Sequence, residues 1–258
     1  MLAYERIGSG PPLVLLHGVG HRRQAWYPVL DRLTSRREVI LVDLPGHGES
    51  DPLVLDGRTG VEILRDELTS FFAQQRLDRP HIGGNSLGGR MALEAAVLGL
   101  AGSVTALSPA GFWRDPGFAY TKRLFRTVER ISGRVGPRAP KLVRSTAGRA
   151  MMFGWINAHP SRLDPDLALG DFNAFTRATP ALHTLVREAT PFTGVVPANI
   201  PVTIAWSAWD LVLPSYQARR ARIALPGARH IRLPGCGHVP MSDDPDLVAG
   251  VLLKGSAA

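Results

Sequence analysis

One serine, Ser86, lies among glycines where an apolar segment gives way to a helical pattern. The stretch from Gly83 to Gly89 reads GGNSLGG, and the apolar run at residues 91–93 follows at once. Glycine is a poor helix former, so its repetition here favours a sharp strand-to-helix turn with no room for side chains. Such a turn would project the Ser86 hydroxyl, and the first N–H groups of the helix would face a developing negative charge. The stretch therefore predicts a nucleophilic serine.

An acid and a base follow Ser86 at comparable places. Asp210 comes after the apolar segment at residues 201–207, and His238 lies in a glycine-rich loop after the segment at residues 229–235. A serine needs an imidazole to take its proton, and a carboxylate holds that imidazole in the required tautomer. Because the carboxyl ends of parallel strands converge, we expect Ser86, Asp210 and His238 to form a catalytic triad.

Other polar residues near these segments have competing interpretations. Asp243 and Asp244 are rivals to Asp210, but they follow the histidine closely and are expected to start the last helix. Cys236 is expected to be a small buried filler. His21 either touches the substrate or faces solvent, and the sequence leaves both open.

Another group of polar residues precedes Ser86 in the chain. Asp43, His47 and Ser50 belong to the segment DLPGHGES and are expected to form a turn rather than to act in catalysis. His17 is expected to be structural, with its ring bonded to nearby backbone.

The elements that must position these residues alternate along the chain. Short apolar, β-branched segments predict strands at residues 12–18, 38–46, 81–86, 103–111, 201–207 and 229–235. Helical patterns cover residues 61–77, 87–101 and 244–253. This alternation predicts an α/β fold with an open, mostly parallel central sheet and helices on both faces.

The region from residue 112 to residue 199 breaks the alternation. It shows no clear strand, and its helical fragments at residues 123–131, 141–156 and 171–178 are separated by Gly and Pro. We expect a helical cap inserted into a core domain, which divides the chain into residues 1–111 (core), 112–199 (cap) and 200–258 (core). Large apolar side chains of this region either line an acyl pocket or form the interior of the cap: Phe112, Trp113, Met151, Met152, Phe153 and Trp155.

The net charge of +8 is concentrated in one part of the chain. Residues 112–150 hold ten Lys or Arg against two acids. No nucleic-acid motif accompanies them, so a solvated basic face is expected rather than a nucleic-acid partner. No apolar run approaches the roughly 20 residues of a membrane span. The first residues resemble neither a signal peptide nor an anchor, which predicts a soluble, cytoplasmic protein.

The single cysteine, Cys236, excludes an internal disulfide and a thiolate metal cluster. We expect no cofactor, no metal and a small-molecule substrate, and the sequence does not indicate an oligomeric state.

Five segments in order resemble those of the α/β-hydrolase superfamily. LLHGVG (residues 15–20) is similar to its oxyanion segment and DLPGHGES (43–50) to its following turn; GGNSLGG resembles the nucleophile elbow, WSAWDLVLP (206–214) the acid loop and GCGHVPMSDDP (235–245) the histidine loop. The resemblance implies the α/β-hydrolase fold with a helical cap. It also implies that the backbone N–H groups of Val19 and Leu87 form the oxyanion hole. A serine at position 86 argues against the haloalkane dehalogenase and epoxide hydrolase branches, which use a carboxylate nucleophile.

The sequence thus predicts a cofactor-free serine hydrolase that cleaves a carboxylic ester or related acyl compound through an acyl-enzyme. A mid-sized, partly apolar substrate is expected, with a carboxylate for the arginines of the cap to receive. One alternative is a carbon–carbon bond hydrolase or a lyase of the same fold. The elbow resembles theirs, but Val239 follows His238 where the carbon–carbon hydrolases usually carry Trp. Acyl transfer or perhydrolysis would use the same residues, and a non-catalytic small-molecule binding protein is the alternative of another class.

Overall fold

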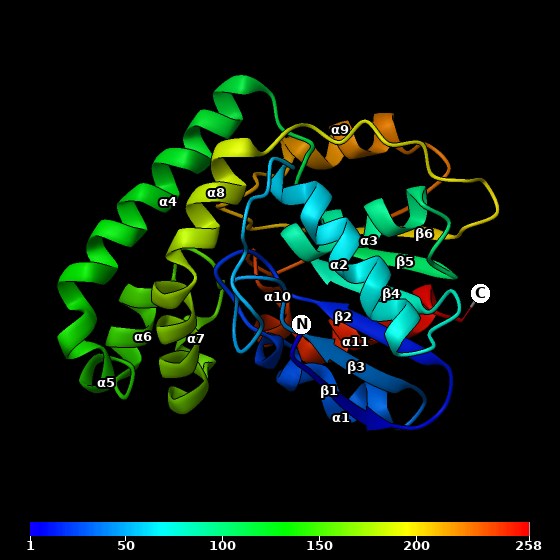
Figure 1. Cartoon of the computed structure of the whole chain (residues 1–258). Helices are drawn as coiled ribbons and strands as arrows, with labels where there is room; N and C mark the ends of the chain where they lie inside the picture. Colours follow the sequence, from blue (N-terminus) through cyan, green and yellow to red (C-terminus); the bar gives the residue numbers. More distant parts are fainter. Residues whose placement is uncertain (258) are drawn as a thin grey trace.

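The computed structural model describes residues 1–257 and contains a seven-stranded sheet (Figure 1). The strands are β1 (Tyr4–Gly8), β2 (Pro12–Leu16), β3 (Glu38–Val42), β4 (His81–Asn85), β5 (Ser103–Leu107), β6 (Val202–Ser207) and β7 (Arg229–Leu233). Their order across the sheet is β1-β3-β2-β4-β5-β6-β7, and only the pairing of β1 with β3 is antiparallel. The expected mostly parallel sheet is confirmed.

The edge strand β1 is the one strand that the sequence analysis missed. Its residues, YERIG, carry two charges and lie mostly exposed, so they lack the apolar run that marks the other strands. The strand forms through backbone pairing with β3, in the register Tyr4↔Val42 to Gly8↔Glu38. The side-chain pattern of an exposed edge strand is a weak signal, because its stabilisation comes mainly from the ladder.

Helices cover both faces of the sheet, as expected for buried parallel strands. The core helices are α1 (Tyr27–Thr34), α2 (Gly60–Gln74), α3 (Leu87–Val97), α9 (Tyr216–Ala224), α10 (Pro240–Asp243) and α11 (Pro245–Gly255). Alternate residues of β2 enter different apolar clusters: Val14 and Leu16 pack with α2 and α3, and Leu13 and Leu15 pack with α1 and α11. The two clusters hold the sheet, and hence the ends of its strands, rigidly between them.

Between β5 and β6 the chain forms helices only. These are α4 (Asp115–Val135), α5 (Ala139–Leu142), α6 (Thr146–Phe153), α7 (Pro165–Arg177) and α8 (Thr179–Glu188), and we call them together the cap. Figure 1 shows most of the cap beyond one end of the sheet, with α4 as its longest helix. Its division from the core at residues 111 and 199 stays a prediction.

One expected helix, over residues 141–156, is divided in the structure. The chain turns at Val143–Ser145, and the Ser145 hydroxyl accepts a hydrogen bond from the Gly148 N–H, which begins α6. A serine at this position satisfies a free N–H of the first helical turn and so favours a new helix start over a continuous helix. Helices α1, α8 and α9 were not among the expected elements.

None of the helices formed by residues 1–257 is both long enough and apolar enough to cross a membrane.

Candidate active site

Ser86 occupies a strained turn between β4 and α3. Its φ of 55° and ψ of −112° lie outside the regions that side chains usually adopt. Three backbone hydrogen bonds hold it there: the Ser86 N–H donates to the Leu107 carbonyl at 2.9 Å, and the Ser86 carbonyl accepts from the N–H groups of Arg90 (2.9 Å) and Ala110 (3.0 Å). The strain is therefore fixed by contacts with β5 and α3, as expected where a turn must aim one side chain.

The glycines around Ser86 fill positions where any side chain would collide with backbone. A Cβ on Gly84 would lie 2.2 Å from the Gly88 carbonyl oxygen, and a Cβ on Gly88 would lie 2.0 Å from the Leu16 carbonyl oxygen. These two glycines let α3 start directly against the ends of β4 and β2. The predicted strand-to-helix turn is thus present.

His238 and Asp210 form a hydrogen-bonded pair at the edge of a pocket. The His238 Nδ1 lies 2.8 Å from Asp210 Oδ2, and the side chains are 7% and 0% exposed. Asp210 Oδ1 accepts hydrogen bonds from the N–H groups of Val212 (2.9 Å) and Leu213 (2.7 Å). A carboxylate held in this way keeps the imidazole proton on Nδ1 and leaves Nε2 free to accept a proton.

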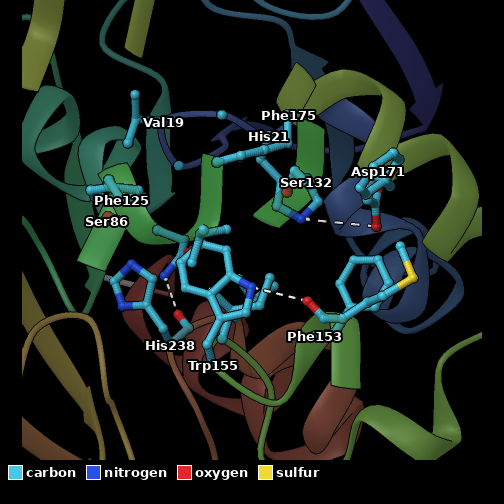
Figure 2. Close-up of a pocket in the computed structure, with 18 residues that line it drawn as sticks. Val19, His21, Ser86, Phe125, Ser132, Phe153, Trp155, Asp171, Phe175 and His238 are labelled. Carbon is cyan, nitrogen blue, oxygen red and sulfur yellow. Dashed lines mark hydrogen bonds and ion pairs between the residues drawn. The ribbon is translucent and has the colours of Figure 1, made fainter. Parts of the chain in front are cut away.

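Ser86 and His238 line the same pocket (Figure 2). Among the described residues, the Ser86 hydroxyl and the His238 ring form no hydrogen bond with each other. Such contacts are often longer before a substrate binds. The structure therefore brings together the pair His238–Asp210 directly, and Ser86 with His238 through a shared cavity.

The segment that carries Val19 passes close to Ser86. Gly18 makes this possible, since a Cβ at that position would lie 3.3 Å from the Ser86 Cβ. Val19 lines the pocket beside Ser86, and Leu87 is the first residue of α3, where N–H groups have no partner within the helix. Within residues 1–257 neither N–H is engaged in a backbone hydrogen bond. Both residues thus lie beside the serine with N–H groups that no backbone carbonyl of the described chain engages.

The buried side chain of His17 holds the backbone of this segment in place. The His17 Nδ1 lies 2.7 Å from the Gly18 carbonyl oxygen, and its Nε2 accepts a hydrogen bond from the Leu44 N–H at 3.0 Å. Burial lowers the pKa of His17 well below its ordinary value, and burial also lowers the pKa of His47 to about 4. His17 is therefore a neutral structural group, as expected.

The turn after β3 is structural too. Asp43 accepts hydrogen bonds from the N–H groups of Arg23 and Glu49, and the Ser50 hydroxyl donates to the Asp43 carbonyl. Arg23 forms ion pairs with Asp43, Glu5 and Glu49. These contacts confirm that Asp43 and Ser50 form a turn.

Asp243 has a different role from the expected start of the last helix. Asp244 does begin α11, because its side chain accepts from the Leu247 N–H at 2.9 Å. The buried Asp243 carboxylate instead accepts three backbone hydrogen bonds: from Gly237 (2.8 Å), beside the proposed base, and from Ala158 (3.0 Å) and His159 (2.8 Å), after α6. The expectation was wrong for Asp243 because sequence spacing does not show the chain segment that returns across this loop.

The loop of His238 has further contacts on both sides. The Asn85 side chain donates to the His238 carbonyl at 2.9 Å, and the Val239 N–H donates to the Ile156 carbonyl at 3.0 Å. Cys236 is fully buried, and burial raises the pKa of its thiol to about 12, so it is an inert filler. His238 is thus fixed between the core and the segment that follows α6.

Aromatic and aliphatic side chains of the cap form most of the opposite pocket wall. Of the six cap candidates, Met152, Phe153 and Trp155 line this pocket. Trp113 lines a second cavity beside Ser86, Phe112 is buried elsewhere, and Met151 is 60% exposed. The sequence analysis missed Phe125, Val128, Ser132, Ile156, Asp171, Phe172 and Phe175. His21 lines the pocket, so contact with a substrate stays a prediction for this residue.

The expectation that arginines receive a substrate carboxylate is wrong for this pocket. Asp171 is the charged side chain among the described residues that line it, and no arginine or lysine does so. The basic residues of α4 face outward because its buried face is formed by Thr121, Phe125 and Ser132. Across residues 1–257, no group of three or more His, Cys, Asp or Glu could hold a metal ion.

Comparisons with known proteins agree with this geometry. The profile of the family described as "Alpha/beta hydrolase family" matches residues 13–251. An uncharacterized protein of Mycobacterium tuberculosis is 29% identical over 94% of this chain and 74% of its own length. A pimeloyl-[acyl-carrier protein] methyl ester esterase of Nitrosomonas europaea is 26% identical over 94% of both chains.

Among solved structures, a thermophilic esterase from Thermogutta terrifontis superimposes with a TM-score of 0.72 at 21% identity, over 98% of this chain and 92% of that one. At this identity the likeness shows the fold alone.

Proposed function

The chain belongs to the alpha/beta hydrolase family, and we propose that it is a serine hydrolase that cleaves a carboxylic ester or related acyl compound. The observation that carries this proposal is the buried His238–Asp210 hydrogen bond, whose histidine shares a pocket with the strained Ser86. The curated relative from Nitrosomonas europaea is named as a methyl ester esterase, which supports an ester as the substrate class.

In the proposed mechanism the Ser86 hydroxyl attacks the substrate carbonyl and transfers its proton to His238 Nε2. Asp210 accepts the Nδ1 proton of the ring as a hydrogen bond and stabilises its positive form. The protonated ring then gives its proton to the leaving alcohol. Water, deprotonated by the same ring, hydrolyses the acyl-enzyme and regenerates Ser86.

The negative charge that develops on the substrate oxygen needs donors beside Ser86. The N–H groups of Val19 and Leu87 meet this need, since both residues lie next to the serine and the N-terminus of α3 favours negative charge. Losing one such donor typically costs 100-fold to 1,000-fold in kcat, that is, about 3–4 kcal/mol. No side chain is required for this step.

A fluorophosphonate probe tests the proposal, because it reacts with activated serines. We expect labelling of the wild-type protein and its loss in Ser86→Ala and in His238→Ala. For Asp210→Asn we expect kcat to fall by about 10⁴-fold, since the amide no longer holds the required tautomer. The exposed Ser35→Ala is the matched control and should label fully. An unlabelled wild-type protein would instead favour a small-molecule binding protein.

The substrate class is tested separately from the nucleophile. We expect a short p-nitrophenyl ester to turn over faster than a chromogenic dienone acid, which the carbon–carbon hydrolases cleave. Val239 lies beside His238 and lines the pocket, so an apolar group occupies that position. Faster turnover of the dienone acid would instead indicate that the protein cleaves a carbon–carbon bond.

A further inference from the structure

A polar pair interrupts the apolar wall of the pocket. His21, from the segment after the proposed oxyanion hole, places its Nε2 3.9 Å from Asp171 Oδ2, on α7 of the cap. The two side chains are 12% and 19% exposed. In Figure 2 Ser86 and His238 lie at one side of the pocket and Asp171 at the other, with Trp155 drawn between them. The pair is therefore remote from the nucleophile.

The hydrogen bonding of His21 determines which of its nitrogens faces the gap as a donor. The Arg22 N–H donates to His21 Nδ1 at 3.1 Å, so Nδ1 carries no proton in the neutral ring. The proton of the neutral ring is then on Nε2, which points toward Asp171. At 3.9 Å the two groups are too far apart to satisfy each other by a direct hydrogen bond.

Asp171 is held in place, and only one of its two carboxylate oxygens accepts a hydrogen bond from the described residues. Its Oδ1 accepts from Arg22 Nε at 3.0 Å, and the Arg22 guanidinium also donates to the Leu167 carbonyl of α7. Arg22 therefore balances the charge of Asp171 and fixes the carboxylate, while Oδ2 faces the pocket as a free acceptor. Ser132, on α4, lines the same pocket.

We propose that the His21–Asp171 pair binds a hydroxyl group of the substrate, at a position remote from the bond that is cleaved. A hydroxyl oxygen in the gap would accept from His21 Nε2 and donate to Asp171 Oδ2. Two hydrogen bonds of about 2.8 Å can span the 3.9 Å separation when the oxygen lies to one side of the line between the two atoms, with an angle of about 90° at the oxygen. This inference rests on the proposed function and names its substrate class: hydroxylated acyl esters.

Other terminal groups fit this gap poorly. A methyl group would leave the His21 donor and the Asp171 acceptor unpaired and partly dehydrated. A carboxylate would face Asp171 Oδ2, and Arg22, the cation paired with Oδ1, does not line the pocket to bind a second carboxylate. A site that hydrogen-bonds a substrate hydroxyl discriminates strongly against analogues that lack it.

Binding to the inert variant Ser86→Ala tests the inference without requiring turnover. The ligands are p-nitrophenyl 6-hydroxyhexanoate, heptanoate and adipate, which share one scaffold and differ at the end of the chain. Shorter and longer homologues, and the butyrate esters of diols and of n-alcohols, cover other placements of the hydroxyl. By calorimetry we expect at least one hydroxylated ligand to bind about tenfold more tightly than its methyl-terminated partner. The adipate should bind most weakly.

Two further substitutions, in the Ser86→Ala background, assign this preference to the pair. His21→Phe keeps a planar ring without the donor, and Asp171→Asn keeps an oxygen for Arg22 but loses the acceptor. In both variants the hydroxylated ligand should bind only about onefold to twofold more tightly than its methyl-terminated partner. Asp166→Asn, on the exposed face of the same helix, is the matched control and should keep the full preference.

The outcomes separate this inference from the proposed function. A hydroxyl preference in Ser86→Ala, together with a wild-type protein that neither labels nor hydrolyses esters, would support the pair and reject the hydrolase. Wild-type hydrolysis with equal binding of hydroxyl-terminated and methyl-terminated ligands in every series would overturn the pair and leave the hydrolase intact. A preference that survives both substitutions would also overturn it.

Discussion

The two walls of the pocket are built in different ways. The core wall presents Ser86, His238 and the segment of Val19, and backbone hydrogen bonds, buried glycines and strand ends fix it. The cap wall is built from side chains that pack on one another: the ring of Trp155 lies edge-on to Phe125 at 6.0 Å and to Phe175 at 6.1 Å between centroids. One wall is determined by backbone geometry and the other by side-chain identity.

This difference explains what each wall can specify. The chemistry of acyl transfer needs atoms at fixed positions, and backbone geometry supplies them at small tolerance. Substrate choice needs a shape and a few polar groups, and packed helices supply these with many possible side chains. The walls meet where Asp243 joins the loop of His238 to the segment after α6, and where Arg22 joins the segment of Val19 to α7.

The largest effect on stability is expected from a single carbon atom added to the core wall. A Cβ at Gly88 would lie 2.0 Å from the Leu16 carbonyl oxygen, so Gly88→Ala must displace α3 or β2. We expect a loss of about 4 kcal/mol or more in the free energy of unfolding, measured by urea denaturation, and a loss of activity in any protein that folds.

The same substitution in the cap should have the opposite sign. Gly133, within α4, has no atom within 4 Å of the added Cβ. Gly133→Ala is expected to stabilise the protein by about 0.5–1 kcal/mol, since alanine favours a helix. Equal effects at the two positions would remove the contrast between the walls.

An intermediate effect is expected at the junction between the walls. Asp243→Ala removes the acceptor for three backbone N–H groups, one of them that of Gly237, the residue directly before His238. We expect a loss of about 3 kcal/mol in stability and a fall in kcat/KM as His238 loses its position.

The neighbouring acid is the control for that variant. Asp244→Ala removes the side-chain hydrogen bond that begins α11. It should lower the free energy of unfolding by about 1 kcal/mol while leaving kcat/KM unchanged. If both variants lowered kcat/KM alike, the Asp243 bridge would not be what positions the base.

A smaller, pH-dependent effect is expected beneath the core wall. Burial lowers the pKa of His47 from 6.5 to about 4, so between these values the unfolded chain binds a proton that the folded chain does not. The free energy of unfolding should therefore decrease as the pH falls, by about 2 kcal/mol from this residue between pH 7 and pH 5. Urea denaturation at both pH values measures it.

A variant without this group should show a weaker dependence. His47→Gln is expected to reduce the difference in unfolding free energy between pH 7 and pH 5 by that amount, whatever its effect at pH 7. His183→Gln, at a largely exposed position on the cap, should keep the full difference. A full difference in His47→Gln would show that another group, such as the buried His17, is responsible.

The core could be predicted from the sequence because its constraints leave marks on residue types. The glycines around Ser86 are required by backbone contacts, and Asp210 and His238 follow the neighbouring parallel strands β6 and β7, whose carboxyl ends lie at the same edge of the sheet. Asp243 could not be assigned in this way, because its partners Ala158 and His159 are distant in sequence and bond through backbone atoms alone.

The residues of the cap wall gave a weaker signal in the sequence, which the structure now makes recognisable. The buried face of α7 repeats at Ala168, Phe172 and Phe175, and Asp171 lies on the same helical face. Ser132 likewise lies on the buried face of α4 with Phe125. An acid and a hydroxyl on apolar helix faces are the signal that could have placed both residues in the pocket.

The cap leaves the sheet after β5 and returns to it at β6, and these strands are hydrogen-bonded neighbours in the register Val104↔Val202 to Leu107↔Ala205. The two ends of the inserted segment are therefore fixed side by side by the sheet itself. A segment anchored in this way can be lengthened, shortened or exchanged for an unrelated one without disturbing the ladder on either side. The architecture permits the pocket wall to be changed between two adjacent junctions, as long as Ile156, Ala158 and His159 stay in place to hold the loop of His238.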